Sequence, residues 1–189
     1  MINQENLKLH LGCGHKILPD YINVDKYGNP DVVFDLETFP WPWENDSVVE
    51  IVMHHVLEHL GQDTNTYLKI IQEIYRICKN QAVIDIQVPH HRHDNFIIDP
   101  THVRPITVEG LTMFSKKANL QWQAAGVATT TLGLYLDVDF EVTSATYVPD
   151  GEWASRWNEK SITLDELSQA ARNFNNVFGE VHIKMVVVK

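Results

Sequence analysis

The chain has 189 residues, of which 44% are hydrophobic and 21% are charged, and its formal net charge is −10 at pH 7. This length and apolar content predict a single domain, residues 1–189, with one well-filled hydrophobic core. Because Asp and Glu (25) outnumber Lys and Arg (15), the composition argues against an extended nucleic-acid interface, which needs a basic surface.

The cysteines and the N-terminal residues indicate in which cellular compartment the protein is expected. Cys13 and Cys78 form neither a disulfide framework nor a CxxC metal motif, so we expect free thiols in a reducing environment. Met1–Glu5 lacks the basic and apolar regions of a signal peptide, and no apolar run reaches membrane-spanning length. We therefore expect a cytoplasmic protein without a membrane partner.

Three short apolar runs near the start of the chain end in glycine or in an acid: Leu7–Leu11 before Gly12-Cys13-Gly14, Tyr21–Val24 before Asp25, and Val32–Phe34 before Asp35. Glycine at a strand exit lets the backbone turn sharply and approach a ligand that a Cβ would exclude. An acid after the following strand can accept hydrogen bonds from a ribose diol. The pattern is typical of a nucleotide-cofactor site, although the glycines could also form a simple turn.

The next segments predict a strand, a helix and a further strand. Ser47–His54 is an apolar, β-branched run that leads into the start of a helix at His55–Leu60. An amphipathic helix follows from an N-cap at Asp63 or Thr64 to Cys78, and Ala82–Val88 is the next strand.

The second half of the chain is less regular. His90–Val103 has no periodicity and predicts a loop, Thr107–Phe114 predicts a short helix, and Leu120–Thr131 favours no single state. The alternation in Gly133–Val148 predicts an antiparallel strand. The last elements are a helix at Thr163–Phe174 with a capping box, and a strand at Glu180–Lys189. This order predicts an α/β fold: a doubly wound, mostly parallel sheet with an antiparallel C-terminal edge strand and helices on both faces.

Four segments together resemble one family, the class I S-adenosylmethionine (SAM) dependent methyltransferases: Leu9–Gly14 (LHLGCG), Asn23–Asp25 (NVD), Phe34–Leu36 (FDL) and Ile51–Leu60 (IVMHHVLEHL). The last segment is similar to the strand and VLEHL run of type 11-like members. The matches keep the family order from Leu7 to Val88, and the resemblance implies a Rossmann-like fold.

The resemblance also implies a set of SAM-binding residues: Gly12, Cys13, Gly14, Asp25, Asp35, Leu36 and His54. The glycines would pass under the methionine part, Asp25 would bind the ribose hydroxyls, and Asp35 with Leu36 would face the adenine. The backbone of His54 would close the methionine end. Two features depart from the family. His10 stands where an acid is usual, and too few residues separate Gly14 from Asp25 for a full crossover helix, so a loop is expected there.

A possible metal site lies in the same region. The run His55-Val56-Leu57-Glu58-His59 matches the HxxEH signature of zinc proteases, but here it follows a strand in methyltransferase order. Some members of the family, among them small-RNA 2′-O-methyltransferases and ubiquinone-pathway O-methyltransferases, bind a divalent metal through an acid-x-x-Glu-His run at this place. The ligands implied here are His55, Glu58, His59 and His102, a set that suits zinc, iron, manganese or nickel better than magnesium. Alternatively, Glu58 and His59 form hydrogen bonds within the helix start and orient the acceptor pocket.

Histidines also supply the candidate catalytic residues. His91 and His93 follow the strand Ala82–Val88, so they are expected on the ligand side of the sheet, as a general base or as substrate-orienting groups. His59 is the third candidate. The alternative for His91 and His93 is a solvated polar loop.

The favoured function is a SAM-dependent methyltransferase that acts on an oxygen or nitrogen of a small-molecule or sugar acceptor, with no nucleic-acid partner. A non-catalytic SAM-binding regulatory protein is the alternative. A metal-dependent RNA-end methyltransferase and an NAD-dependent oxidoreductase are less favoured; the latter lacks the third glycine of GxGxxG, where the chain has Ile17. The sequence predicts neither the acceptor nor the oligomeric state.

Overall fold

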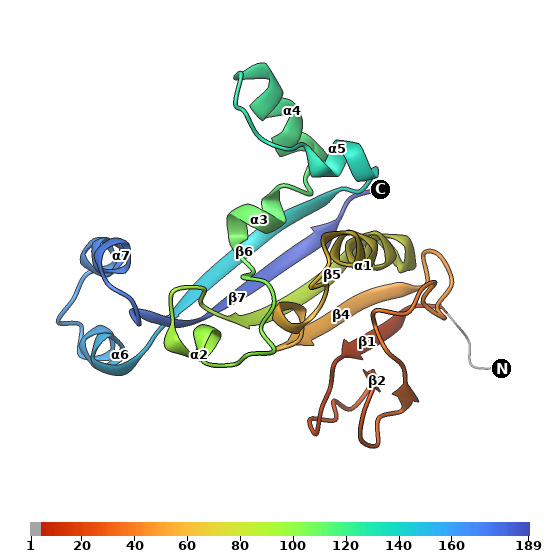
Figure 1. Ribbon diagram of the computed structural model, residues 1–189, viewed down its shortest axis with the longest axis horizontal. Coiled ribbons are helices and arrows are strands. Elements are labelled where there is room, and N and C mark those ends of the chain that lie inside the picture. The colour runs from red at the N-terminus through yellow and green to blue at the C-terminus, as the bar shows by residue number, and fades with distance from the viewer. Residues whose placement is uncertain (1–4) are drawn as a thin grey trace.

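The computed structural model describes residues 5–189 and contains one seven-stranded sheet with the order β3-β2-β1-β4-β5-β7-β6 (Figure 1). The strands are β1 (Leu7–Leu11), β2 (Ile22–Asp25), β3 (Val32–Val33), β4 (Val48–His54), β5 (Cys78–Pro89), β6 (Phe140–Pro149) and β7 (Phe178–Val187). β1 to β5 pair in parallel, whereas β7 pairs antiparallel with both β5 and β6. The predicted mostly parallel sheet with an antiparallel C-terminal edge is confirmed.

Eight helical segments connect the strands in the described part of the chain: η1 (Leu57–His59, a 3-10 helix), α1 (Thr64–Ile77), α2 (Asp94–Ile97), α3 (Val108–Thr112), α4 (Lys116–Ala124), α5 (Leu132–Leu136), α6 (Gly151–Asn158) and α7 (Leu164–Asn173). The Asp63 side chain caps α1, and Thr163 with Glu166 forms the predicted capping box of α7. None of these helices is long and apolar enough to cross a membrane. Met1–Gln4, part of the segment examined for a signal peptide, lies outside the described residues.

The hydrophobic core lies between one face of the sheet and α1. Side chains alternate along β1, β4, β5 and β7, so that apolar residues of all four strands point to the same face. Ile51, Ile84 and Ile183 are fully buried there, and Ile70 and Ile74 of α1 pack in the same cluster. Burial of these side chains stabilises the arrangement that brings the strand exits together.

The opposite face of the sheet is polar. Lys8 pairs with Glu50 (2.9 Å), and Asp85 lies between His54 (3.2 Å) and Lys184 (3.5 Å). The connection between β1 and β2 is a loop, as its length predicted. In the described residues no helix lies between β1 and β3, because the connections among β1, β2 and β3 are too short to form one.

Two segments of the second half differ from the sequence prediction. Residues 133–136, expected in a strand, belong to the helix α5, and β6 begins only at Phe140. The reason is a tertiary contact: the Gly133 N–H donates to Met113 O, and a Cβ on Gly133 would lie 2.9 Å from Phe114 O. The helix α6, which was not predicted, has no buried residue, although Trp153 and Trp157 recur at helical spacing.

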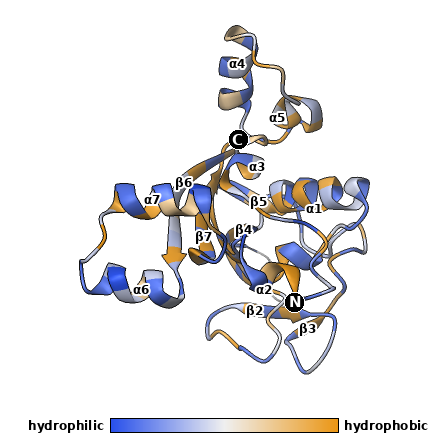
Figure 2. Cartoon of the chain, turned by 60° about the vertical axis from the view of Figure 1, so that its left-hand side comes forward, coloured by the Kyte–Doolittle hydropathy of each residue, from blue (hydrophilic) through white to orange (hydrophobic). Residues whose placement is uncertain are grey.

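Two helix pairs project away from the sheet, α4 with α5 and α6 with α7 (Figures 1 and 2). The α6–α7 pair is inserted between β6 and β7 and has a small hydrophobic cluster of its own, separate from the main core: Ile162, Leu167, Ala170, Val177 and Phe178. The α6–α7 pair lies at the carboxyl end of β5, whereas α4 and α5 lie near its amino end, because Phe140 at the start of β6 pairs with Val187.

Candidate functional site

The exits of β1, β2 and β4 enclose a cavity of about 320 Å³. Its lining residues are Gly12, Gly14, Asp25, Lys26, Phe34, Asp35, Leu36, Glu37, His55, Val56, His59 and Leu60. Ligands of doubly wound sheets bind outside the carboxyl ends of the strands, where the strand order reverses. Five of the seven predicted cofactor residues meet here, from three different strand exits.

The glycine turn after β1 forms the floor of this cavity. Gly12 has φ +66°, and a Cβ at this position would lie 2.2 Å from Cγ2 of Val56. Gly14 also has a positive φ, +53°, but the space in front of it is open. Gly12 is therefore required by packing, whereas Gly14 leaves its backbone accessible to a ligand. The Cys13 side chain is buried and does not line the cavity.

Asp25 is held by two backbone groups. Its Oδ2 accepts a hydrogen bond from the Gly14 N–H and its Oδ1 accepts one from the Tyr27 N–H, each at 2.9 Å. A carboxylate has about four acceptor positions, so both oxygens retain the capacity to bind a diol. Asp35 is fixed in a similar way, because its Oδ1 accepts from the Glu37 N–H (3.0 Å). Both carboxylates are thus held in a fixed orientation by the backbone, before any ligand binds.

Two histidines near the glycine turn lie outside the cavity. The His54 ring points to the polar sheet face, where its Nε2 lies 3.2 Å from Asp85 Oδ1, so only its backbone is near the site. His10 is buried and its Nδ1 lies 3.1 Å from Asn23 Oδ1. Burial lowers the pKa of His10, and this position therefore carries a neutral imidazole instead of the usual acid.

Comparisons with known proteins agree with this geometry. No protein-family model and no curated protein matches the sequence. Among solved structures, a SAM-dependent methyltransferase from Archaeoglobus fulgidus superposes with a TM-score of 0.56 at 19% identity, over 97% of this chain and 86% of that one. One from Methanosarcina mazei has a TM-score of 0.55 at 13% identity, over 99% of this chain and 94% of that one. The chain has the fold of the class I SAM-dependent methyltransferases.

A further neighbour with this methyltransferase fold contains ligands. It is the 1,6-didemethyltoxoflavin-N1-methyltransferase of Burkholderia thailandensis, with bound 1,6-didemethyltoxoflavin and S-adenosylhomocysteine. The TM-score is 0.52 at 11% identity, over 98% of this chain and 72% of that chain.

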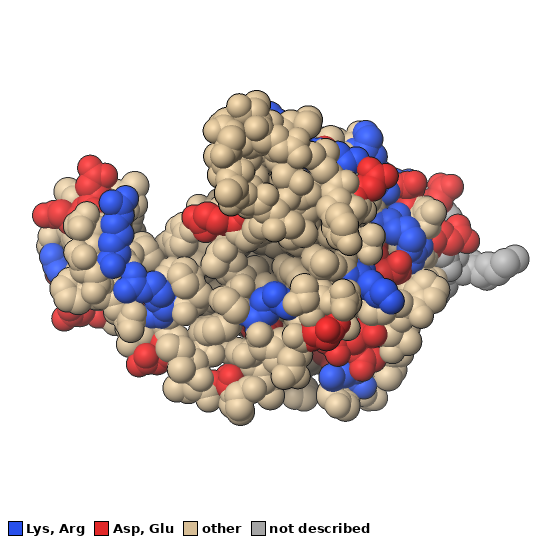
Figure 3. Space-filling model, turned by 45° about the horizontal axis from the view of Figure 1, so that its top comes forward, with Lys and Arg blue, Asp and Glu red and all other residues tan. Residues whose placement is uncertain are grey.

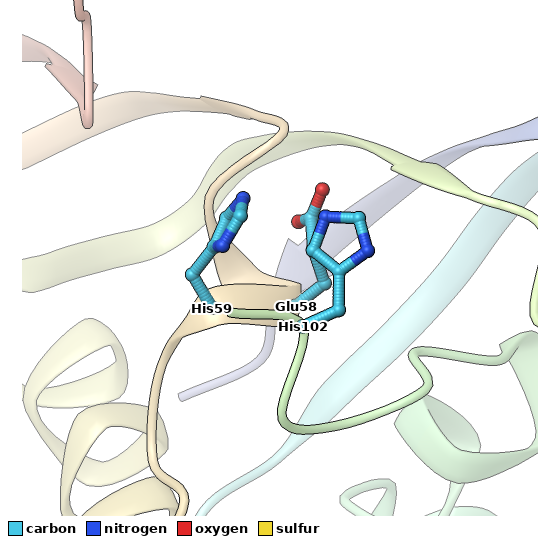
Figure 4. A group of neighbouring side chains, drawn as sticks. All are labelled: Glu58, His59 and His102. Atoms are coloured by element: carbon cyan, nitrogen blue, oxygen red, sulfur yellow. The ribbon is translucent and has the colours of Figure 1, made fainter. Parts of the chain in front are cut away.

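Beside the cavity, this chain has a cluster of side chains that could bind a metal ion (Figure 4). Glu58, His59 and His102 each offer one ligand atom, and these atoms all lie within 4.8 Å of one another. Glu58 is fully buried, and neither of its carboxylate oxygens has a hydrogen-bond partner. Its ion-pair contact among the described residues is His55, at 3.6 Å, and a metal cation at this point would further offset the cost of burying the carboxylate.

The two imidazoles of the cluster are oriented by hydrogen bonds from Nδ1. His102 Nδ1 lies 2.9 Å from the Phe96 carbonyl oxygen, which only accepts, so Nδ1 carries the proton. His59 Nδ1 lies 2.9 Å from Thr101 Oγ1, whose own proton is donated to Asp99 Oδ1 (2.6 Å). In both rings the lone pair is therefore left on Nε2, which is the arrangement seen when the second ring nitrogen orients a metal ligand. Two imidazoles and a carboxylate fit zinc or another transition metal.

His55, the fourth predicted ligand, is not part of this group. Its Nδ1 lies 3.6 Å from Glu58 Oε1 and its Nε2 lies 3.5 Å from Glu180 Oε1. Glu58 is the main group that raises the pKa of His55, which favours an imidazolium between two carboxylates. The structure thus places His55 in the wall of the cavity, as an ion-pair partner of Glu58 and Glu180.

The three predicted catalytic histidines lie in different surroundings. His59 lines the cavity and belongs to the metal cluster. His93 uses both ring nitrogens: Nδ1 accepts from the Asn95 N–H and Nε2 lies 3.0 Å from Asp150 Oδ2, so it has a structural role. His91 is exposed and lines a second cavity.

Some site residues were not predicted. Lys26 and Glu37 directly follow predicted residues at strand exits, a position that could have drawn attention to them. Glu180 comes from β7, near the other end of the chain, and only the antiparallel pairing of β5 with β7 brings it to His55. No local sequence signal marks that contact.

Proposed function

We propose that the protein is a SAM-dependent methyltransferase that methylates an oxygen or nitrogen of a small-molecule acceptor. One cavity carries the proposal. It is lined by the open backbone at Gly14, by the carboxylate of Asp25, and by Asp35 with Leu36. Three strand exits supply these groups in the order that a nucleotide-containing cofactor requires. The small-molecule acceptor named for the Burkholderia neighbour supports the same class of acceptor.

SAM, when bound, supplies a methyl group that is already activated on a sulfonium sulfur. The protein has to bind the cofactor, align the acceptor and exclude water. Asp25 accepts hydrogen bonds from the ribose, Phe34 and Leu36 provide apolar walls for the adenine, and Gly14 leaves room for the methionine part.

Calorimetry tests the cofactor assignment. S-adenosylhomocysteine should bind at micromolar concentration and NAD should not. Asp25→Asn keeps the shape of the side chain but makes it a weaker hydrogen-bond acceptor for the ribose hydroxyls. We expect the affinity for S-adenosylhomocysteine to fall about tenfold or more. Asp20→Asn, at an exposed position of the loop between β1 and β2, is the matched control. If S-adenosylhomocysteine does not bind, the proposal is wrong.

Turnover separates an enzyme from a regulatory binder. The protein should transfer a labelled methyl group from SAM to at least one member of a panel of small phenols, amines and sugars. Tight binding without transfer to any of them would favour the alternative, a SAM-binding regulatory protein.

We further propose that Glu58, His59 and His102 hold a divalent transition metal. The support is the buried carboxylate of Glu58, whose oxygens have no hydrogen-bond partner, together with two imidazoles that each offer one ring nitrogen within 4.8 Å of the other ligand atoms. Such an ion acts as a Lewis acid toward an acceptor oxygen or nitrogen. Because His59 also lines the cofactor cavity, the cluster lies beside the cofactor site proposed above.

Elemental analysis of protein purified without chelators tests this site. We expect close to one zinc, iron, manganese or nickel ion per chain, and its loss in Glu58→Gln and in His102→Ala. His15→Ala, at an exposed histidine outside the cluster, should retain the metal. A chelator should lower the melting temperature of the native protein but not that of Glu58→Gln. Metal-free native protein whose stability is unchanged by a chelator would contradict the proposal.

A further inference from the structure

A second cavity, of about 720 Å³, opens between the exit of β5, the ends of β6 and β7, and the inserted pair α6–α7. Figure 3 shows this face hollowed between the α6–α7 pair and the rest of the molecule, with charged atoms at its edges; Arg92, Glu109 and Arg172 are among the residues that line the cavity. None of the predicted cofactor or metal residues lines it. Its size is within the range typical of small-molecule sites.

Aromatic rings form one side of the second cavity. The rings of His90 and His91 lie 4.4 Å apart at 35°, those of Tyr147 and Phe178 lie 5.3 Å apart, and His90 contacts both of the latter at less than 6 Å between centroids. Burial lowers the pKa of His90 to about 4, and it also lowers that of His91. At neutral pH these imidazoles are uncharged flat surfaces with one donor and one acceptor each.

The opposite wall is apolar and exposed. Leu164 is 63% exposed and Trp157 is 40% exposed, although both side chains line the cavity. The wall is fixed in place by Arg92, whose guanidinium donates to Ala171 O (2.7 Å) and Arg172 O (3.2 Å) at the end of α7. Arg92 is thus used for structure, and the cavity offers stacking surfaces more than charge.

The second cavity lies near the cofactor cavity, although no residue lines both. The His90 N–H donates to Gly179 O (2.9 Å), and the next residue, Glu180, lies 3.5 Å from His55 in the wall of the cofactor cavity. Phe178, on the other side of Gly179, lines the second cavity. A molecule held there can therefore direct one atom toward the cofactor while its body stays between the rings and α7.

We propose that the second cavity binds the methyl acceptor and that this acceptor is a planar aromatic or heteroaromatic molecule. This inference rests on the proposed methyltransferase function. Stacked and edge-on rings favour a flat π-system over a sugar, which would need many polar partners. Neutral imidazoles add hydrogen bonds to ring nitrogens or hydroxyls without favouring a strongly charged ligand.

A pair of probes tests the shape and chemistry of the site. We expect 2-naphthol to bind about tenfold more tightly than decahydro-2-naphthol, which has the same carbon skeleton but is not flat. Tyr147→Leu should remove this difference. Tyr135→Leu, at a tyrosine that is 77% exposed on α5 and outside the cavity, should leave it unchanged. Equal binding of the two probes, or an unchanged preference in Tyr147→Leu, would overturn the proposal.

Kinetics test the acceptor role. With planar phenols or amines as acceptors, Tyr147→Leu should raise KM about tenfold and leave the Kd of S-adenosylhomocysteine unchanged. If only saturated sugars are methylated, the inference fails while the methyltransferase proposal stands. If 2-naphthol binds but S-adenosylhomocysteine does not, the methyltransferase proposal fails, and the cavity is an aromatic-binding site without an acceptor role.

Discussion

The two cavities at the carboxyl end of the sheet are built from different parts of the chain. The cofactor cavity is formed by backbone turns and short acids at strand exits, and sheet hydrogen bonds hold them: Gly12 N–H and Cys13 N–H both donate to Val24 O. The second cavity is formed largely by side chains of an insertion that has its own small core. Under the two proposals above, the frame of the fold binds the cofactor and the insertion binds the acceptor. Substitutions should therefore affect the two cavities separately.

The largest effect is expected from Gly12→Ala, which acts on the frame. The new Cβ would meet Val56 at 2.2 Å in a backbone with φ +66°. We expect a loss of about 3 kcal/mol in the free energy of unfolding, together with the loss of S-adenosylhomocysteine binding. Urea denaturation and calorimetry measure the two quantities.

Gly14→Ala is the control for this substitution. Its φ is also positive, +53°, but no atom lies within 4 Å of the new Cβ, so only the backbone cost of about 1 kcal/mol is expected. Equal destabilisation by the two substitutions would show that the contact with Val56 is unimportant.

Leu167→Ala should act on the insertion alone. Leu167 is 1% exposed in the cluster of α6 and α7. Its truncation should lower the free energy of unfolding of that helix pair by about 2 to 3 kcal/mol. In hydrogen exchange, amides of α6 and α7 should lose protection while those of β1 and β4 keep it, and the affinity for S-adenosylhomocysteine should not change. If protection falls equally in both regions, the insertion is not an independent unit.

The smallest effect is expected from pH, through the second cavity. The pKa of His90 is about 4 in the folded protein because of burial, against 6.5 as the ordinary value. The stability that His90 contributes is complete above pH 6.5 and is lost as pH falls toward 4, because the unfolded chain then binds the proton first. Between pH 6.5 and pH 5 this linkage amounts to about 2 kcal/mol.

Urea denaturation at these two pH values, with the native protein and His90→Gln, measures the dependence. The variant should lose less stability than the native protein between these pH values. Part of the pH dependence should remain, because desolvation also lowers the pKa of His10 and of His91. His15→Gln, at an exposed position, should behave as the native protein does. If the native protein is equally stable at pH 6.5 and at pH 5, the lowered pKa of His90 is contradicted.

Sequence reasoning was most accurate where structure is local. The strand exits that end at Gly12, Asp25 and Asp35 are defined by short apolar runs and by the glycine or acid after them. The capping box of α7 is likewise contained in four residues. Even the contact of His102 with Glu58 follows from the motif and one nearby loop, which is tied down by hydrogen bonds from Val103 N–H and Arg104 N–H to Glu58 O.

Prediction failed where distant segments decide the structure. The alternation in residues 133–136 suits a strand, but the contact of Gly133 with the end of α3 makes this segment a helix. The second cavity could not be predicted, because residues 90–92, 145–149 and 164–172 meet only after β7 has paired between β5 and β6. The helix α6 has no buried residue, and only Trp153 and Trp157 mark the apolar side that indicates a helix there.

The polar sheet face has a practical consequence for labelling. Both cysteines, Cys13 and Cys78, are buried, and burial raises the pKa of each thiol, that of Cys78 to about 12, so neither is reactive. Lys184→Cys would place one exposed thiol in the middle of β7, on the face opposite α1. A fluorophore or a surface linker attached there leaves both cavities open to solvent.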